Sequence, residues 1–214
     1  MVKLVDNDVL QFRKYRVRSI LPREIEAVWQ LDNKIFEDTP IPKQIFQSWL
    51  QVYPEGFKVA LDSFDKIVGY IMVFRLKKEE IQHKWDIDTG NGFCIKHNPN
   101  GEILYGVSCI SQAPTVGTAL CLAARHLAVK HTELKEIWAY SRLVNFAQWK
   151  QENCPDKPIA FCLDKYIKLH SDPVQLFYES VGCTAVKGIE GYLPGDKASL
   201  GCAALTKWSK PELH

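Results

Sequence analysis

The sequence has 214 residues, of which 46% are hydrophobic and 24% are charged, and its formal net charge at pH 7 is +2. This composition is ordinary for a globular protein, and the length favours one domain with a sizeable core. The basic residues are spread along the chain, which argues against a nucleic-acid-binding surface. Hydrophobic runs stay shorter than a membrane span, and residues 1–12 lack the apolar core of a secretion signal, so we expect a cytoplasmic protein that does not enter a membrane.

The chain contains seven cysteines, and none of them forms a C-x-x-C pair. Most stand among apolar neighbours: Cys94, Cys109, Cys121, Cys162, Cys183 and Cys202. Free thiols buried in a reducing compartment show this pattern, whereas disulfide frameworks and zinc sites show regular spacings. The sequence therefore predicts free cysteines and no metal site.

The first third of the chain reads as one strand, two helices and a hairpin. Residues 14–20 alternate polar and apolar side chains, as a strand does, which leaves 1–13 as an N-terminal extension. Pro22 suits the first turn of a helix, and a second helix is expected over 42–52. Two antiparallel strands are then expected, over 57–62 and 66–76.

A polar, glycine-containing segment over 77–92 predicts a loop. The next apolar residues, 93–97, precede the turn sequence His-Asn-Pro-Asn-Gly, and another apolar run covers 102–111. This arrangement predicts a second hairpin, with 93–97 and 102–111 as its two strands.

Residues 102–131 are predicted to form a strand, a short loop and a helix at the centre of the fold. A nearly continuous apolar run predicts a buried strand, and apolar residues at i, i+3, i+4 and i+7 then predict a helix. The loop between them, over 112–117, contains Gly117. A helix that follows such a loop directs its first free N–H groups towards an anion, so this junction is a candidate phosphate-binding site.

The last third of the chain begins with a strand over 136–143 and a long segment over 144–172. Part of this segment, near 159–169, has the pattern of a helix. Asp172 and Pro173 begin a further helix that ends at Gly182, and the last two strands are expected over 183–189 and 199–208. The order of elements predicts a single α/β or α+β domain with a mixed sheet and helices.

At this point the sequence resembles the GNAT superfamily of acyl-CoA-dependent N-acyltransferases, from Tyr15 to Trp208. The order of elements is the family's order. Pro114-Thr-Val-Gly-Thr-Ala119 falls where the family has (Gln/Arg)-x-x-Gly-x-(Gly/Ala), and Leu176-Phe-Tyr-Glu-Ser-Val-Gly-Cys183 resembles its F-Y-x-x-x-G-F signature. Pro114 departs from the family pattern, because it replaces Gln or Arg and has no N–H.

The resemblance implies a mostly antiparallel sheet with helices on both faces and a V-shaped gap between two central parallel strands. The domain would cover 14–214, with an insertion over 143–172 that lies over the acceptor site. The ending of the chain is closer to a subgroup that includes the GNAT-like loading domains of some polyketide synthases. Tyr178 and Leu193 stand here where those domains have His and Arg, so we do not carry over their decarboxylation and S-acyl transfer.

The family's use of acetyl-CoA, or another acyl-CoA, as co-substrate implies a binding site in the gap. The pantetheine arm would contact the strand residues, and the pyrophosphate would contact the start of the central helix. The residues implied in binding are Cys109, Ile110, Thr115, Val116, Gly117, Thr118, Ala119 and Ser141.

The resemblance also assigns a proton donor, Tyr178, to the departing thiolate. A phenol with a pKa near ~10 is protonated at neutral pH and can donate to a thiolate. The base that deprotonates the acceptor stays open between Glu102, Glu179, His170 and a chain of water molecules.

The predicted reaction is transfer of a short acyl group to the amine of a small molecule or peptide by direct attack. The acceptor pocket would come from residues 35–42, 77–92 and 144–172, with Glu37 and Asp38 as groups that attract an amine. Two alternatives stay open, namely S-acyl transfer that involves the phosphopantetheine of an acyl carrier protein, and acyl-CoA binding without turnover. The missing His and Arg argue against an acyl carrier protein as a partner. The family resemblance is compatible with a homodimer.

Overall fold

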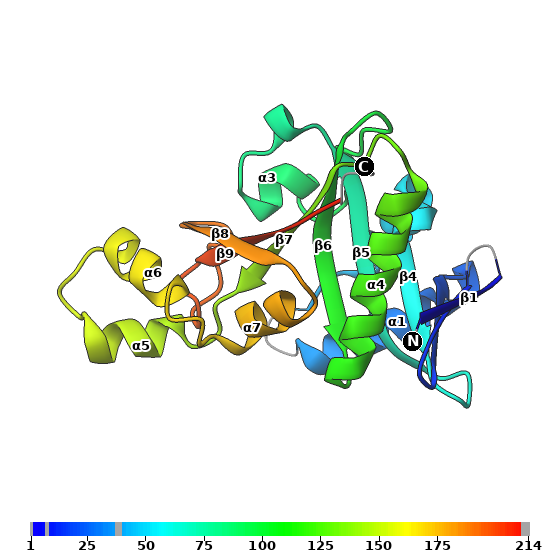
Figure 1. Cartoon of the computed structure of the whole chain (residues 1–214), viewed down its shortest axis with the longest axis horizontal. Helices are drawn as coiled ribbons and strands as arrows, with labels where there is room; N and C mark the ends of the chain where they lie inside the picture. The colour runs from blue at the N-terminus through cyan, green and yellow to red at the C-terminus, as the bar shows by residue number, and fades with distance from the viewer. Residues whose placement is uncertain (1, 7–8, 37–39, 211–214) are drawn as a thin grey trace.

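A computed structural model describes residues 2–6, 9–36 and 40–210 of the chain. Within these ranges nine strands form one sheet in the order β1-β2-β3-β4-β5-β6-β7-β9-β8 (Figure 1). Every neighbouring pair is antiparallel except β6 and β7, which are parallel. The mixed, mostly antiparallel sheet predicted from the sequence is confirmed.

The strands follow the predicted hydrophobic runs closely. Their bounds are β1 Val2–Asp6, β2 Val9–Phe12, β3 Tyr15–Ser19, β4 Phe57–Leu61, β5 Ile67–Leu76, β6 Ile103–Ser111, β7 Glu136–Arg142, β8 Thr184–Ile189 and β9 Ala203–Ser209. Residues 2–6 and 9–12, which we expected to form an extension, are a hairpin that continues the sheet through β2 and β3. The side chains of β4 and β5 are almost all buried, as expected for strands covered on both faces.

Helices cover both faces of the sheet. Their bounds are α1 Ile25–Ile35, α2 Lys43–Val52, α3 Trp85–Thr89, α4 Pro114–Lys130, α5 Phe146–Asn153, α6 Ile159–Ile167 and α7 Pro173–Ser180, with 3-10 turns at Pro22–Glu24, Pro54–Gly56 and Lys78–Glu80. Glu37 and Asp38, our candidates for attracting an amine, lie outside the described residues.

Two consecutive residues of β5 distinguish the two faces. Successive side chains of a strand point to opposite sides of the sheet. The Tyr70 ring packs against Trp49 of α2 and its hydroxyl donates to Asp32 of α1, whereas a side chain at Gly69 would meet Val116 of α4. We call these the α1 face and the α4 face; Figure 1 shows α4 lying along β5 and β6.

The predicted hairpin of 93–97 with 102–111 is wrong. Strand β6 pairs with β5 and β7, and residues 93–97 form turns instead of a strand. The cause is a run of residues with positive φ, Gly90 (63°), Asn91 (57°), Gly92 (88°) and Cys94 (58°), which turns the backbone back on itself. The Cys94 N–H then donates to Thr89 O at 2.7 Å. The segment 77–92, which we expected to be a loop, contains α3.

The parallel pairing of β6 with β7 is short. It joins Ile103–Tyr105 to Glu136–Trp138, and in this described part of the chain both strands then continue without pairing to each other. Each strand stays paired on its other side, β6 with β5 as far as Ser111 and β7 with β9 as far as Arg142. Beyond this point the two inner edges are not paired with each other, as the V-shaped gap requires. One inner-edge group is already occupied, since Val107 O accepts the Trp85 indole N–H at 3.2 Å.

The inserted segment forms two helices, α5 and α6, with an apolar cluster of their own. This cluster joins them to β9 and the end of β7, and a side chain at Gly188 of β8 would meet Leu163 of α6. Figure 1 shows α5 and α6 at the opposite end of the sheet from β1. Asp172 connects the insertion to α7: its carboxylate accepts the Tyr166 hydroxyl at 3.1 Å and caps α7 through Val174 N at 3.0 Å.

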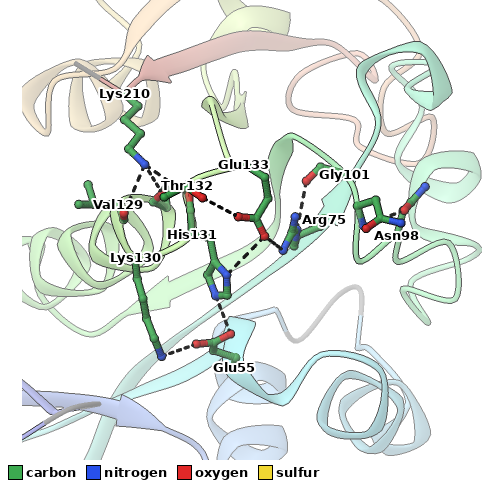
Figure 2. A network of polar contacts seen from close by, with 12 residues as sticks. Glu55, Arg75, Asn98, Gly101, Val129, Lys130, His131, Thr132, Glu133 and Lys210 are labelled. Carbon is green, nitrogen blue, oxygen red and sulfur yellow. Dashed lines mark hydrogen bonds and ion pairs between the residues drawn. The ribbon is translucent and has the colours of Figure 1, made fainter. Parts of the chain in front are cut away.

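A polar network fixes the end of α4 to the start of β6 (Figure 2). Glu55 accepts from Lys130 at 2.8 Å and from His131 at 2.9 Å. The buried Arg75 pairs with Glu133 at 2.8 Å, and its Nε donates to Gly101 O at 3.1 Å. This network lies at the end of β6 where pairing with β7 is complete, so it gives His131 a structural role far from the gap.

All seven cysteines are free in the structure; five are buried, and Cys109 and Cys183 are partly exposed. Across the described residues, no helix combines the length and the apolar character that a membrane span needs. Over the same part of the chain, no group of His, Cys, Asp and Glu side chains has the arrangement of a metal site.

Candidate active site

The helix at the candidate phosphate site begins earlier than expected. We predicted a loop over 112–117, but α4 starts at Pro114, with Ala113 as its N-cap. Proline is favoured at the first helical position because its fixed φ suits the helix and its missing N–H has no helical partner there. The Val116 and Gly117 amides both donate to Ala113 O, at 3.0 and 3.3 Å. The departure at Pro114 therefore starts the helix without removing a bond that the helix would otherwise make.

The residues implied in pyrophosphate binding form the first turns of α4. The Val116 and Ala119 side chains are fully buried in the core. Because the Val116 and Gly117 amides already donate to Ala113 O, a ligand at this helix end would meet the Thr115 amide first. The Thr118 hydroxyl donates to Pro114 O at 3.1 Å. Thr115, at the second helical position, is half-buried and faces the exposed end of the helix.

Gly117 allows α7 to pack against α4. A side-chain carbon at this position would lie 2.8 Å from Phe177 Cζ and 3.1 Å from Ser111 Oγ. Both distances are shorter than a normal contact, so only glycine permits this packing without displacing the ring. The glycine predicted to admit a ligand therefore also sets the position of the helix that carries Tyr178.

We expect Gly117→Ala to lower the free energy of unfolding by about 1–3 kcal/mol, because the added carbon overpacks the contact with Phe177. Phe177→Leu in the same chain removes the clashing ring atoms and should recover part of the loss, which a double-mutant cycle by urea denaturation would measure. Gly195→Ala is the control, since its added carbon meets nothing within 4 Å. Equal effects of Gly117→Ala and Gly195→Ala would contradict the packing role.

Tyr178 lies on α7 and faces the same side of the sheet as α4. Burial raises the pKa of its phenol well above the usual value, and the nearby thiols of Cys109, Cys121 and Cys183 raise it further. The hydroxyl is therefore protonated throughout the neutral range. The structure brings together two residues that the sequence assigned to one site, namely Tyr178 as proton donor and Cys109 in the unpaired part of β6.

The remaining strand residues lie along the same gap. Ile110 is buried and follows Cys109 in the unpaired part of β6. Ser141 lies in the part of β7 that is paired with β9 but not with β6. Its side chain is fully buried, and its hydroxyl has no hydrogen-bond partner among the described residues. An unpartnered buried hydroxyl is costly, and at a site this cost is offset when a ligand supplies the partner.

The three candidate bases lie outside the gap. Glu102 precedes β6 at its paired end, where its carboxylate accepts the Lys78 amide at 3.1 Å. His170 and Glu179 pair with each other at 2.8 Å, and the His170 side chain is 58% exposed. The structure therefore brings none of these three to the region where β6 and β7 are no longer paired with each other.

Arg142 ends β7 and pairs with the loop before β9. Its guanidinium donates two hydrogen bonds of 2.6 Å to the Asp196 carboxylate, which also accepts the Ser199 hydroxyl at 2.7 Å. Burial alone would raise the pKa of Asp196, but the bonds from Arg142 and Ser199 hold it below its usual value. This bidentate pair fixes the loop 190–202 onto β7.

The α1 face of the gap carries an aromatic cluster that the sequence analysis did not identify. At the last position of β6 paired with β7, the Tyr105 hydroxyl donates to Asp88 at 3.3 Å, and its oxygen lies 3.2 Å from the Tyr192 hydroxyl, which then supplies the hydrogen of that bond. The Tyr192 ring stacks on Tyr140 at 4.1 Å, and the Tyr140 hydroxyl lies 2.6 Å from His83 Nδ1. These residues come from four separate segments of the chain, which meet only in the folded protein.

Comparison with known proteins identifies the fold. No protein-family model matches the chain. Two relatives from Bacillus subtilis (strain 168) each align with 94% of it. The probable hydrolase YhcX is 26% identical over 212 residues, and the chain spans only 40% of its length. The uncharacterized N-acetyltransferase YkwB is 24% identical over 215 residues, and the chain spans 92% of its length.

Similar solved structures cover nearly the whole chain. The GphF GNAT-like decarboxylase in complex with isobutyryl-CoA has a TM-score of 0.77 at 17% identity, over 91% of this chain and 98% of that one. The loading GNATL domain of CurA from Lyngbya majuscula has a TM-score of 0.75 at 18% identity, over 91% and 97%. Arabidopsis thaliana NAA60 in complex with acetyl-CoA has a TM-score of 0.59 at 12% identity, over 92% and 99%. The chain has the GNAT-like fold that its sequence resemblance predicted.

Proposed function

We propose that this chain transfers a short acyl group from an acyl-CoA to an amine, in a complex that holds both substrates. One observation carries the proposal: β6 and β7 part beside the start of α4, and the helix that carries Tyr178 packs against α4 at Gly117. An extended pantetheine arm would pair with the inner edges of the two strands, much as a sheet edge pairs with an added strand, at groups other than Val107 O, which already accepts the Trp85 indole N–H. The buried Ser141 hydroxyl, which has no partner among the described residues, and the Thr115 amide in the first turn of α4 are donors that this ligand would satisfy.

In this mechanism the chain contributes position, polarisation and protons. Backbone N–H groups near Cys109 and Ile110 hold the thioester carbonyl and stabilise the charge that develops on its oxygen. The amine attacks directly, so no nucleophile of the protein is needed. Tyr178 gives its proton to the departing thiolate. Its phenol is protonated at neutral pH and therefore has a proton to donate. Holding both substrates in the gap lowers the entropic cost of their encounter.

The chain's closer likeness to loading domains supports a second candidate, S-acyl transfer that involves a carrier-protein thiol. The TM-scores of 0.77 to the GphF GNAT-like decarboxylase and 0.75 to the loading GNATL domain of CurA exceed the 0.59 to NAA60. The amine stays the favoured acceptor, since Tyr178 and Leu193 stand where the loading domains have His and Arg. YhcX is described as a hydrolase, but this chain spans less than half of it.

We expect wild-type protein to acetylate at least one member of a panel of primary amines and amino-terminal peptides. Thiol release from acetyl-CoA gives the rate, and mass spectrometry of the acceptor identifies the product. The same assay with a phosphopantetheinylated carrier protein, read by intact mass, tests the second candidate. Acetyl-CoA turnover with the carrier protein alone would contradict the amine as acceptor, and no turnover with any acceptor would contradict both.

A further inference from the structure

Helix α1 contains a carboxylate buried in the core. Asp32 is 0% exposed and falls on the apolar stripe of α1, together with Ile25, Val28 and Leu31. One carboxylate oxygen, Oδ1, accepts the Tyr70 hydroxyl, and the other, Oδ2, has no hydrogen-bond partner among the described residues. A buried carboxylate without a cation is expensive, so such groups are frequent where a protein needs a base.

The hydrogen bonds around Tyr70 have a defined direction when Asp32 is ionised. A carboxylate only accepts hydrogen bonds, so the Tyr70 hydroxyl donates its single hydrogen to Asp32. The Tyr70 oxygen also lies 3.0 Å from Ser108 Oγ. Because Tyr70 has no second hydrogen, Ser108 must donate this bond. The lone pairs of Ser108 Oγ are then free to accept a proton from outside the chain of bonds.

Ser108 lies at the gap. It belongs to the part of β6 that is not paired with β7, next to Cys109, and it is half-buried. Its bond to Tyr70 places its side chain on the α1 face, whereas Cys109 approaches Tyr178 on the α4 face. The Tyr178 phenol and the Ser108 hydroxyl therefore lie on opposite faces of the sheet at β6. This arrangement suits two groups of which one acts on the leaving thiolate and the other on the attacking amine.

We propose that Ser108, Tyr70 and Asp32 form a relay that removes the proton of an alkylammonium acceptor before it attacks. This inference rests on the proposed function and names the acceptor class for it. The N–H bond of the ammonium breaks as its proton passes to Ser108 Oγ. The Ser108 proton passes to Tyr70 and the Tyr70 proton to Asp32, which yields a neutral amine and a neutral carboxyl group. Once product leaves, the reverse transfers return the proton to water at Ser108.

The electrostatics of the relay agree with this role. Burial raises the pKa of Asp32, which makes its carboxylate a stronger base than an exposed one. Burial first, and then the charge of Asp32, raise the pKa of Tyr70 and keep its phenol protonated; the Cys109 thiol acts on Tyr70 in the same direction. Tyr70 on β5 is the one titratable group that acts on Asp32 within the described chain, and no cation there pairs with it.

The relay is tested with two kinds of acceptor. An alkylamine is protonated at pH 7, whereas an arylamine is neutral and needs no base before attack. We expect Asp32→Asn to lower kcat/KM about 100-fold for an alkylamine, with little change for an arylamine. Ser108→Ala and Tyr70→Phe should act in the same direction. In Asp32→Asn the ascending limb of the pH profile should move to the pKa of the amine itself, near ~10. Asp164→Asn, an exposed carboxylate on α6, is the matched control.

A second readout does not depend on activity. A carboxyl group whose pKa is raised in the folded protein binds more protons folded than unfolded, so its contribution to stability falls as pH rises from its unfolded value of 3.8 through its folded value. We therefore expect the stability of Asp32→Asn relative to wild type to increase with pH over this window. Urea denaturation between pH 4 and pH 8 measures the difference, with Asp164→Asn expected to show none.

The outcomes separate the relay from the proposed function. Selective loss of alkylamine transfer in Asp32→Asn and Ser108→Ala, with arylamine transfer retained, supports the relay. Full alkylamine activity in these two variants overturns the relay while the proposed function stands. Equal losses for both kinds of amine also overturn it, since they indicate a structural role. Absence of transfer to every amine by wild type overturns the proposed function and the relay with it.

Discussion

Tyr178→Phe is expected to lower kcat for acyl transfer by roughly 100- to 10,000-fold, the range that follows removal of a general acid. The substitution removes one oxygen and keeps the ring, so the contact with Phe177 at 5.4 Å and the position of α7 are retained. Affinity for acetyl-CoA should change little, because the phenol acts on the thiolate that forms only during the reaction. Steady-state kinetics, together with calorimetry of acetyl-CoA binding, measure both quantities on the same preparation.

Tyr53→Phe is the matched control for this substitution. The Tyr53 hydroxyl is buried and has no hydrogen-bond partner among the described residues, and Tyr53 follows α2 beside Glu55, Arg75 and Glu133, at the end of the sheet where β6 and β7 are still paired. Its removal should leave kcat unchanged and leave stability equal or slightly higher. Wild-type kcat in Tyr178→Phe would rule out the proton donor. A loss of acetyl-CoA binding equal to the loss of kcat would instead indicate a role in the ground state.

Asp172→Ala is expected to lower the free energy of unfolding by about 3 kcal/mol, the largest stability effect that we predict. The substitution removes the N-cap of α7, worth about 1 kcal/mol, and leaves the buried Tyr166 hydroxyl without its acceptor, at about 1–3 kcal/mol more. The midpoint of thermal unfolding should fall by roughly 6–12 °C for a chain of this size. Because α7 carries Tyr178, activity should fall at temperatures where the folded protein still predominates.

Two further substitutions separate the effect of the lost α7 N-cap on stability from the effect of removing a negative charge. Asparagine is as good an N-cap as aspartate, so Asp172→Asn should keep most of the stability. Asp164→Ala removes an exposed carboxylate 4.0 Å from Lys168 and should change the free energy by less than about 0.5 kcal/mol. Thermal unfolding of all three variants at one pH tests this order. An Asp172→Ala protein as stable as Asp164→Ala would contradict the assigned link between the insertion and α7.

Much of the fold follows from local patterns. Apolar runs predicted β4, β5, β6 and β9, and the Asp-Pro and Gly signals predicted the ends of α7, because the physical causes are local in sequence. The failure at 93–97 has a local cause that the pattern does not reveal. The apolar side chains there are compatible with a strand, but Asn91 and Cys94 adopt positive φ, which residues other than glycine seldom do.

The candidate site was predictable only where a motif marked it. The family-like motif led to Tyr178, whose role as proton donor stays a prediction; the Cys109 thiol acts on the pKa of its phenol. Asp32 carried a weaker signal, an acidic residue at a buried position of the α1 stripe, which we did not weigh. The aromatic cluster around Tyr140 had none, because its members meet only after β6, β7 and two loops have folded together. Contacts between distant segments are set by tertiary packing, which a single sequence does not encode in any local pattern.

Binding of acetyl-CoA, measured by calorimetry, tests the central claim most directly. The account predicts one site per chain for acetyl-CoA and for free CoA, and weaker binding of adenosine 3′,5′-bisphosphate, which lacks the pantetheine arm that the gap between β6 and β7 would hold. Equal affinity for the bisphosphate and acetyl-CoA would mean that the gap takes no part in binding. Absence of binding by every CoA species would contradict the claim that this chain uses an acyl-CoA.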